Sequence, residues 1–145
     1  MIGLLQRVSS ASVDVSGRAI GAIGPGLLVL VGVQKDDDEV KAGRLLERLL
    51  GYRVFADEAG RMNLSLRDIG GGLLLVPQFT LAADTLKGTR AGFSTAAEPA
   101  RARELFDALV EAARAAWPRT ASGEFGADMK VSLTNDGPVT FWLES

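Results

Sequence analysis

Apolar residues alternate with polar ones in several short segments, and this period of two predicts β-strands. Residues 11–15 show it clearly, with Ala11, Val13 and Val15 at the apolar positions. Residues 26–33 are almost wholly apolar, which is typical of a strand covered on both faces. The same signals, with turn residues between them, predict further strands over residues 1–8, 18–23, 52–55, 72–76, 129–133 and 139–143.

Two longer segments carry apolar side chains at helical spacing. Residues 38–50 and 99–116 are expected to be amphipathic helices, ended by Gly51 and Pro118. Pro99 suits the first turn of the second helix. The expected buried stripes are Val40, Leu45, Leu46, Leu49 and Leu50 in the first helix, and Leu105, Phe106, Leu109, Val110, Ala113 and Trp117 in the second.

The order of these elements is four strands, a helix, strands, a helix and strands. This is not the regular alternation of a doubly wound parallel sheet. We therefore expect an α/β fold in which a mainly antiparallel sheet, barrel-like or two-layered, has two helices packed on one side. No internal repeat or linker divides the sequence, so residues 1–145 are expected to form a single domain.

Composition restricts the chemistry. Hydrophobic residues make up 47% of the chain, enough for a substantial core. The chain has no cysteine, which excludes disulfides and a thiolate nucleophile. It also has no histidine, the commonest general base at neutral pH and the commonest zinc ligand. A hydrolytic mechanism would have to work without imidazole, and we expect no metal and no cofactor.

Charge and hydropathy bear on partners and location. The net charge is −2, whereas a protein that grips a long nucleic acid is normally basic. A contact with RNA is therefore expected only at a short end of the RNA. The overall charge does not exclude a local basic patch on the protein. The N-terminus lacks the pattern of a secretory signal, and the apolar runs are too short to span a bilayer. We expect a cytoplasmic protein without membrane contact.

An acidic run, Asp36 to Glu39, precedes the first expected helix. Its carboxylates suit either a metal site or the capping of a helix N-terminus. Capping is favoured, because a helix follows at once.

Three segments place polar groups beside buried strands: residues 61–65 (RMNLS), 77–82 (PQFTLA) and 135–140 (NDGPVT). Each also has a purely structural explanation. Gln78 and Thr80 would face solvent at the end of a strand, and residues 135–138 would form a hairpin turn. Known sequence motifs for nucleotide binding, zinc proteases and serine hydrolases are absent.

Taken together, these segments resemble the D-aminoacyl-tRNA deacylase family along the whole chain. The family signature is a serine-glutamine-phenylalanine-threonine segment and an asparagine-x-glycine-proline-x-threonine segment near the C-terminus. Here they read Pro77-Gln78-Phe79-Thr80 and Asn135-Asp136-Gly137-Pro138-Val139-Thr140. The stretches KDDD, GYRVF, MNLS and QFTLAADT occur in the family's order. Pro77 departs from the usual serine, and Arg90-Ala91-Gly92-Phe93 departs from arginine-proline-serine-phenylalanine, so the pocket is expected to be somewhat altered.

The resemblance implies hydrolysis of the ester bond of D-aminoacyl-tRNA, a proofreading step in translation, and of glycyl-tRNA mischarged on tRNA-Ala. Its catalytic positions are Gln78, Phe79 and Thr80. Main-chain N–H groups near Phe79 and Thr80 would form an oxyanion hole. The 2′-hydroxyl of the terminal adenosine would assist. Thr80 is either a nucleophile or, as favoured, a positioning residue, since no adjacent base would activate it.

The resemblance also implies how chirality is read. Gly137-Pro138 would be a cis peptide that enters the active site of a partner subunit, so the protein would be a homodimer that binds the 3′ end of aminoacyl-tRNA. Carbonyl groups there would collide with an L side chain. Arg7 would steady this pair, and the remaining substrate-binding positions are Pro77, Met129, Asn135 and Thr140.

Two other functions stay open. A non-catalytic module that binds nucleic-acid ends would also fit the missing histidine and cysteine. An editing domain separated from a synthetase is the third alternative. Hydrolysis of D-Tyr-tRNA distinguishes an enzyme from a binding module.

Overall fold

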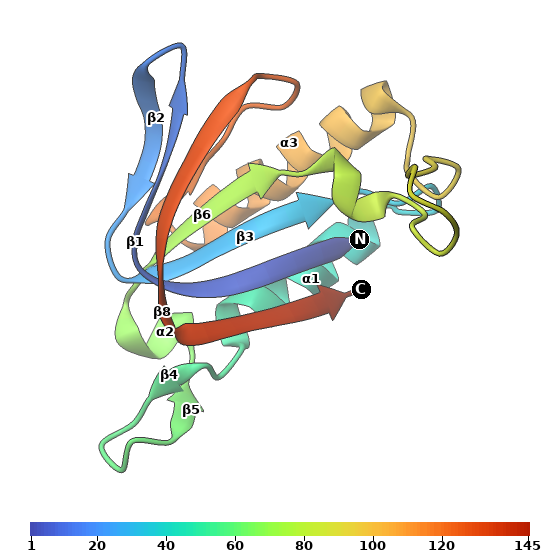
Figure 1. The fold of residues 1–145 in the computed structure, drawn as a ribbon. Coiled ribbons are helices and arrows are strands. Elements are labelled where there is room, and N and C mark those ends of the chain that lie inside the picture. Colours follow the sequence, from blue (N-terminus) through green and yellow to red (C-terminus); the bar gives the residue numbers. More distant parts are fainter.

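A six-stranded sheet forms the centre of the computed structural model, which describes residues 1–145. Strands β2, β1, β3, β6 and β7 lie in that order, and β8 pairs along β1 (Figure 1). A separate hairpin of β4 and β5 projects from the body. The bounds are β1 Ile2–Val15, β2 Arg18–Ile23, β3 Gly26–Gly32, β4 Phe55–Ala56, β5 Met62–Leu64, β6 Gly72–Pro77, β7 Thr120–Ser122 and β8 Met129–Glu144.

The sheet is mixed, and its antiparallel part is the larger. β1 pairs antiparallel with β2, β3 and β8. β3 with β6 and β6 with β7 are parallel pairs. Parallel neighbours need a crossover, and α1 and α3 supply the two crossovers. The expectation of a mainly antiparallel sheet is confirmed.

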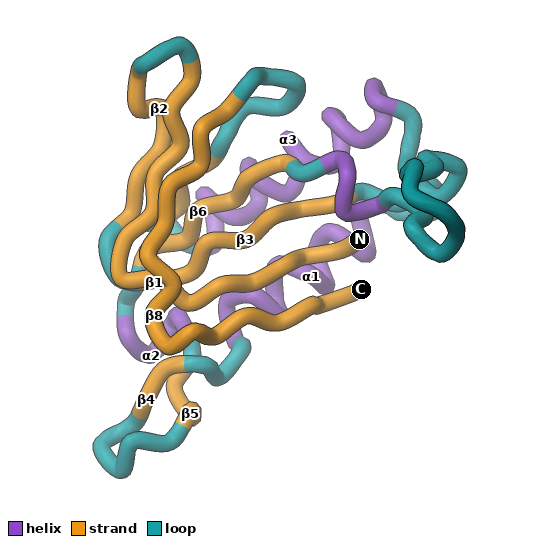
Figure 2. The backbone as a smooth tube through the Cα atoms, in the orientation of Figure 1, coloured by secondary structure: helices purple, strands orange, loops and turns teal.

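β1 bends, and its second half carries β2 toward β6 and β7, so that the sheet nearly closes into a barrel (Figures 1 and 2). A Cβ atom added at Gly21 of β2 would lie 2.9 Å from the carbonyl oxygen of Ser122 in β7. Only glycine permits this approach between the two strands.

Two long helices, α1 (Glu39–Gly51) and α3 (Pro99–Ala116), cover the same side of the sheet (Figure 2). Both predicted helices are confirmed. Their apolar faces join β1, β3 and β6 in the main core of 24 buried residues. The prediction that Val40 belongs to the buried stripe is wrong. Val40 lies about 140° around the helix from Leu45 and is 61% exposed. Ala42 takes its place. Two short helices, α2 (Leu66–Ile69) and η1 (Phe79–Ala82), were not expected.

In two places, a pair of strands predicted as separate is one continuous strand in the structure. The predicted segments 1–8 (apart from Met1) and 11–15 belong to β1, and the predicted segments 129–133 and 139–143 belong to β8. The register between β1 and β8 shifts on both sides of Val8. Such bulges interrupt the alternation of side chains without ending the strand, so the sequence pattern looked like a break.

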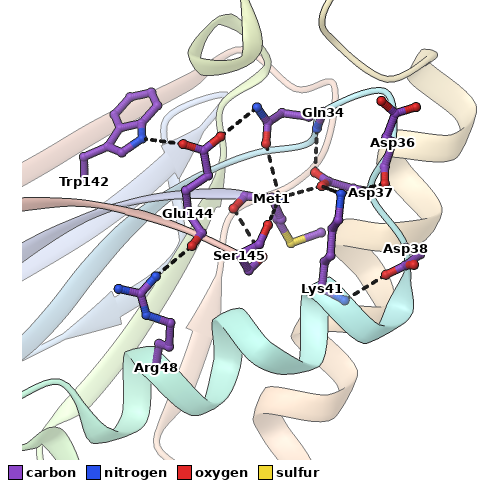
Figure 3. A network of polar contacts seen from close by, with 10 residues as sticks. All are labelled: Met1, Gln34, Asp36, Asp37, Asp38, Lys41, Arg48, Trp142, Glu144 and Ser145. Atoms are coloured by element: carbon purple, nitrogen blue, oxygen red, sulfur yellow. Dashed lines mark hydrogen bonds and ion pairs between the residues drawn. The ribbon is translucent and has the colours of Figure 1, made fainter.

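The acidic run holds the start of α1, as the capping interpretation predicts. The side chain of Asp38 accepts a hydrogen bond from Lys41 N at 2.8 Å. The buried carboxylate of Asp37 accepts from Met1 N at 2.5 Å and from Gln34 N at 2.7 Å (Figure 3). Glu144 accepts from Gln34 and Arg48, so this network ties β1, α1 and the end of β8 together.

Residues 61–65 also have a structural role. Ser65 caps α2, and its hydroxyl accepts from Asp68 N while the Asp68 carboxylate accepts from Ser65 N at 2.7 Å. These hydrogen bonds from the backbone and side chain of Ser65 lower the pKa of Asp68. None of the helices is long and apolar enough to cross a membrane.

Candidate functional site

The segment at the end of β6 exposes a polar and an aromatic side chain. Pro77 is the last residue of β6, as its missing N–H predicts, and Gln78 N resumes the hydrogen bonding by donating to Val31 O at 2.8 Å. The chain then turns into η1. Phe79 and Thr80 are exposed, and Gln78 Nε2 donates to Thr80 Oγ1 at 2.6 Å. We call Pro77, Gln78, Phe79 and Thr80 the η1 site.

Two main-chain N–H groups are free in the η1 site. Phe79 and Thr80 are the first residues of η1, and the first N–H groups of a helix have no acceptor within it. The turn and loop hydrogen bonds include Leu81 N to Gln78 O, but none from Phe79 N or Thr80 N. Gln78 makes no side-chain cap. Two adjacent donors, on two exposed residues, are therefore available to an anionic oxygen.

An apolar cavity of about 320 Å³ opens beside Phe79. Three predicted site residues line it: Pro77, Phe79 and Met129. Its other lining residues are Pro99, Phe125, Gly126 and Ala127. Phe79 also stacks on Phe93, with ring centroids 5.0 Å apart and planes at 25°. The η1 site thus combines free N–H donors with an apolar wall. This combination suits a ligand in which a polar group is attached to a flat or apolar group.

A second site motif lies in β8. Between the pairs Gln6–Thr140 and Val8–Asn135, one residue of β1 faces four residues of β8. The extra residues form a loop over residues 136–139, which contains the cis peptide Gly137-Pro138. The predicted cis bond is confirmed, and the hairpin-turn alternative is wrong, because β8 continues through the segment along β1.

Asn135 closes this 136–139 loop. Its Oδ1 accepts from Val139 N at 2.7 Å, and its Nδ2 donates to Thr140 Oγ1 at 2.9 Å. Gly137 has φ of +145°, and a Cβ added there would lie 2.7 Å from Val139 Cγ2. The backbone conformation and the crowding both favour glycine at this position.

Arg7, the residue of β1 opposite the loop, holds it from the other side. Its Nε donates to Asp136 O at 2.8 Å, and its Nη1 donates to Val54 O at 2.6 Å. The Arg7 side chain is only 16% exposed, and its bond to Val54 O is partly buried. The arrangement agrees with the steadying role implied for Arg7.

A full-length match fixes the family. Residues 4–144 match the sequence model of a family described as D-Tyr-tRNA(Tyr) deacylase. The chain belongs to this family.

Two curated relatives match this chain over nearly the whole length of both sequences. The D-aminoacyl-tRNA deacylase of Thioalkalivibrio sulfidiphilus is 68% identical over 144 residues, 99% of this chain and 97% of the relative. That of Alkalilimnicola ehrlichii is 65% identical, over 100% and 97% of the two chains.

Two solved structures share the fold. The first is described as the c-Myc DNA Unwinding Element Binding Protein, with a TM-score of 0.95 and 38% identity over 100% of this chain and 99% of that one. The second, described as a probable eukaryotic D-amino acid tRNA deacylase, has a TM-score of 0.88 at 17% identity over 99% and 98%.

The two motifs of this deacylase-family chain lie far apart within one subunit. Through the strand registers, Pro77 lies level with Val31 and Gly3, whereas the 136–139 loop lies level with Arg7 and Leu27. Four residues along a strand span about 13 Å, and the three steps from β8 to β6 span about 14 Å, so the separation is about 20 Å. Figure 1 shows η1 beyond the tip of β6 and the bend of β8 near the start of β3.

Other features lie outside these motifs. A larger hollow of about 600 Å³ lies at the starts of β3 and β6, but no predicted site residue lines it. Arg119 there donates to Gly70 O. No group of three or more acidic side chains is arranged to hold a metal ion. Hydrogen bonds from its own backbone and from Arg101 lower the pKa of Glu39.

Sequence reasoning missed several residues around the cavity. Phe93, Pro99 and Phe125 come from a loop, the start of α3 and the segment before β8. Phe125 is held by Arg103, whose Nη2 donates to its carbonyl at 3.1 Å. None of these three residues belongs to a periodic pattern, so no local signal in the sequence indicated their place at the cavity.

Proposed function

We propose that this chain hydrolyses the ester bond of D-aminoacyl-tRNA, releasing the D-amino acid and the intact tRNA. The observation that carries the proposal is full-length identity of 68% to a relative named D-aminoacyl-tRNA deacylase. The proposal treats residues 1–145 as one deacylase domain and includes a cytoplasmic location, where aminoacyl-tRNA is used. The alternative of a non-catalytic end-binding module is not favoured by the names of these relatives.

The free donors of the η1 site suggest how the ester is activated. The N–H groups of Phe79 and Thr80 would bind the carbonyl oxygen as it becomes an oxyanion. Donors of this kind need no proton transfer, which fits a chain without histidine. Orientation of the ester and of a water would supply much of the rest, assisted by the 2′-hydroxyl of the terminal adenosine.

Thr80 acts in this mechanism as a positioning residue. Its Oγ1 accepts a hydrogen bond from the Gln78 amide, and an amide group is not a base that removes a proton from the hydroxyl. A nucleophilic hydroxyl needs such a base. The hydrogen bond instead fixes the Thr80 side chain and leaves its proton available to substrate.

We further propose a homodimer in which the 136–139 loop of each chain completes the η1 site of the other. The separation of about 20 Å within one chain supports this, because an ester at the η1 site cannot reach its own loop. The outer edge of β8 pairs with no strand, and it carries the exposed Phe141 and Trp142. Unpaired edges and exposed apolar side chains favour association.

In this dimer the Gly137-Pro138 backbone would select the D-enantiomer. Neither residue has a pairing partner on β1, so their carbonyl groups can project from the strand. A main-chain wall cannot move aside cheaply and makes no demand on side-chain type. It would reject an L side chain and admit a range of D-amino acids, as well as glycine.

The test is release of tyrosine from D-Tyr-tRNA and L-Tyr-tRNA by the purified protein, compared with spontaneous hydrolysis. We expect fast release from the D-ester alone. Binding of tRNA without release of D-tyrosine would refute the proposal in favour of the binding module.

A further inference from the structure

A closed loop stands beside the η1 site. Asp84 and Gly92 exchange two backbone hydrogen bonds, with N–O distances of 2.8 and 2.9 Å, and so close a loop over residues 84–92. Every residue of this 84–92 loop is exposed, and Leu86 is 90% exposed. The loop therefore adds little to the core.

The 84–92 loop is anchored directly on η1. Phe93, the next residue, stacks on Phe79 at 5.0 Å, and Thr95 Oγ1 donates to Ala82 O at 2.6 Å. These contacts fix one end of the loop to the residue that supplies a free N–H and a cavity wall. The 84–92 loop therefore lies next to the η1 site.

Apart from Asp84 at its closing pair, the 84–92 loop has two ionisable residues, Lys87 and Arg90, and both are cations. The side chains of Lys87 and Arg90 form no hydrogen bond or ion pair in the structure. Some arginines elsewhere are engaged: Arg7 and Arg48 bind carbonyl groups, and Arg101 pairs with Glu39. Lys87 and Arg90 are unpaired cations on a loop anchored to η1, in a chain of net charge −2.

We propose that Lys87 and Arg90 bind the phosphates of the single-stranded 3′ end of tRNA, immediately before the terminal adenosine. This assignment rests on the proposed function, which puts the terminal ester at the η1 site. Long basic side chains reach the phosphates of the preceding nucleotides, and the arginine fork matches phosphate oxygens. The local pair supplies attraction that the acidic chain as a whole does not.

The test compares the double variant Lys87→Ala/Arg90→Ala with the wild type on two substrates. D-Tyr-tRNA carries the phosphates, whereas the D-tyrosyl ester of adenosine has none. Each lost phosphate contact makes the negative slope of log(kcat/KM) against log[salt] less steep by about 0.7 for a single strand. With two such contacts, a rise in salt from about 50 to 200 mM should lower the activity of the wild type on D-Tyr-tRNA. This loss should be about sevenfold larger for the wild type than for the variant. The adenosine ester should be hydrolysed alike by both.

A matched control has the same change in charge elsewhere. Arg18→Ala/Arg44→Ala removes two exposed cations that also lack partners, one beside the turn before β2 and one on α1. This control should keep the salt slope of the wild type. Binding of uncharged tRNA, measured by fluorescence anisotropy, should show the same shallower slope for the loop variant alone.

Three outcomes separate the possibilities. Equal slopes for the loop variant and the wild type, in hydrolysis and in binding, overturn the assignment. An equal loss on the adenosine ester also overturns it, because the loop would then shape the cavity instead of holding phosphates. Failure of the wild type to release D-tyrosine from either substrate refutes the proposed function, and tRNA binding then decides the role of the loop.

Discussion

Two impaired variants of this protein should restore activity when their subunits are mixed, if each site combines the η1 site of one chain with the 136–139 loop of the other. The first variant is Phe79→Pro, which removes one of the two free N–H groups and an aromatic wall of the cavity. Proline is tolerated at the first position of a helix, and Phe79 is the first residue of η1, so the fold should persist.

The second variant is Gly137→Ala. The new Cβ atom would lie 2.7 Å from Val139 Cγ2 and 3.0 Å from Val139 N, at a φ of +145° that L residues rarely adopt. The loop must therefore shift. Displacement of a catalytic element by about 1 Å can cost about 10²-fold in rate, and loss of one oxyanion donor costs about 10²–10³-fold. Each variant alone should retain about 1% activity or less.

Mixing the two variants equally, by unfolding and refolding together, should recover about a quarter of the wild-type rate. Half of the dimers are then mixed, and each mixed dimer has one site with an intact η1 site and an intact partner loop. The assay is release of D-tyrosine from D-Tyr-tRNA at a fixed total concentration of protein. A 25-fold rise above the separate variants is easily measured.

The control combines both substitutions in one chain and mixes it with the wild type. In a shared-site dimer the mixed species has no intact site, so activity falls to about a quarter of the wild type. If each chain carried a complete site, this mixture would keep about half, and the two single variants would show no recovery. That pair of results would refute the shared site.

Three further predictions concern selectivity, chemistry and stability. D-Ala-tRNA and Gly-tRNA should be hydrolysed while L-Ala-tRNA is not, in parallel deacylation assays; comparable loss of the L-ester would defeat the steric filter. Thr80→Val should lower kcat by about tenfold, with no acyl-enzyme detectable by mass spectrometry in the wild type; a trapped adduct on Thr80 would make it the nucleophile instead. Ser65→Ala should cost about 1 kcal/mol of stability and lower the Tm by about 3 °C without changing kcat. Because the folded-state pKa of Asp68 is lowered, its contribution is complete above the ordinary value of 3.8 and disappears as pH falls through the folded value. The difference in Tm between the two proteins should therefore shrink below pH 3.8, and a constant difference would contradict this account.

The helices were predictable because their signal is local. An apolar stripe and a capping residue lie within one segment, and both helices match their predicted bounds within one or two residues. The lengths of β1 and β8 were not predictable, because the bulges around Val8 depend on the partner strand. Nor did the pattern reveal the parallel pairs, since β3 and β6 are 39 residues apart in sequence.

The site was predictable only as sequence motifs. Residues 77–80 and 135–140 were identified by resemblance, and the structure adds the hydrogen bonds that organise each segment. The cavity wall at Phe125 and the ring of Phe93, which stacks on Phe79, come from segments without periodicity. Their roles arise from tertiary contacts, which a single sequence does not encode in any local pattern.

Main-chain groups and side chains have different roles in the proposed site. The groups proposed to meet substrate are mostly main-chain groups: two N–H donors in η1 and the carbonyls of Gly137-Pro138. Apart from substitution by proline, which removes an N–H group, a change of side chain leaves a backbone group in place, but the position of that group can be lost. Asn135 makes hydrogen bonds to both Val139 and Thr140, and Arg7 bonds to Asp136 O. In the proposed dimer these side chains would hold the reacting geometry without needing to react, so two chains without histidine or cysteine could together form a hydrolytic site.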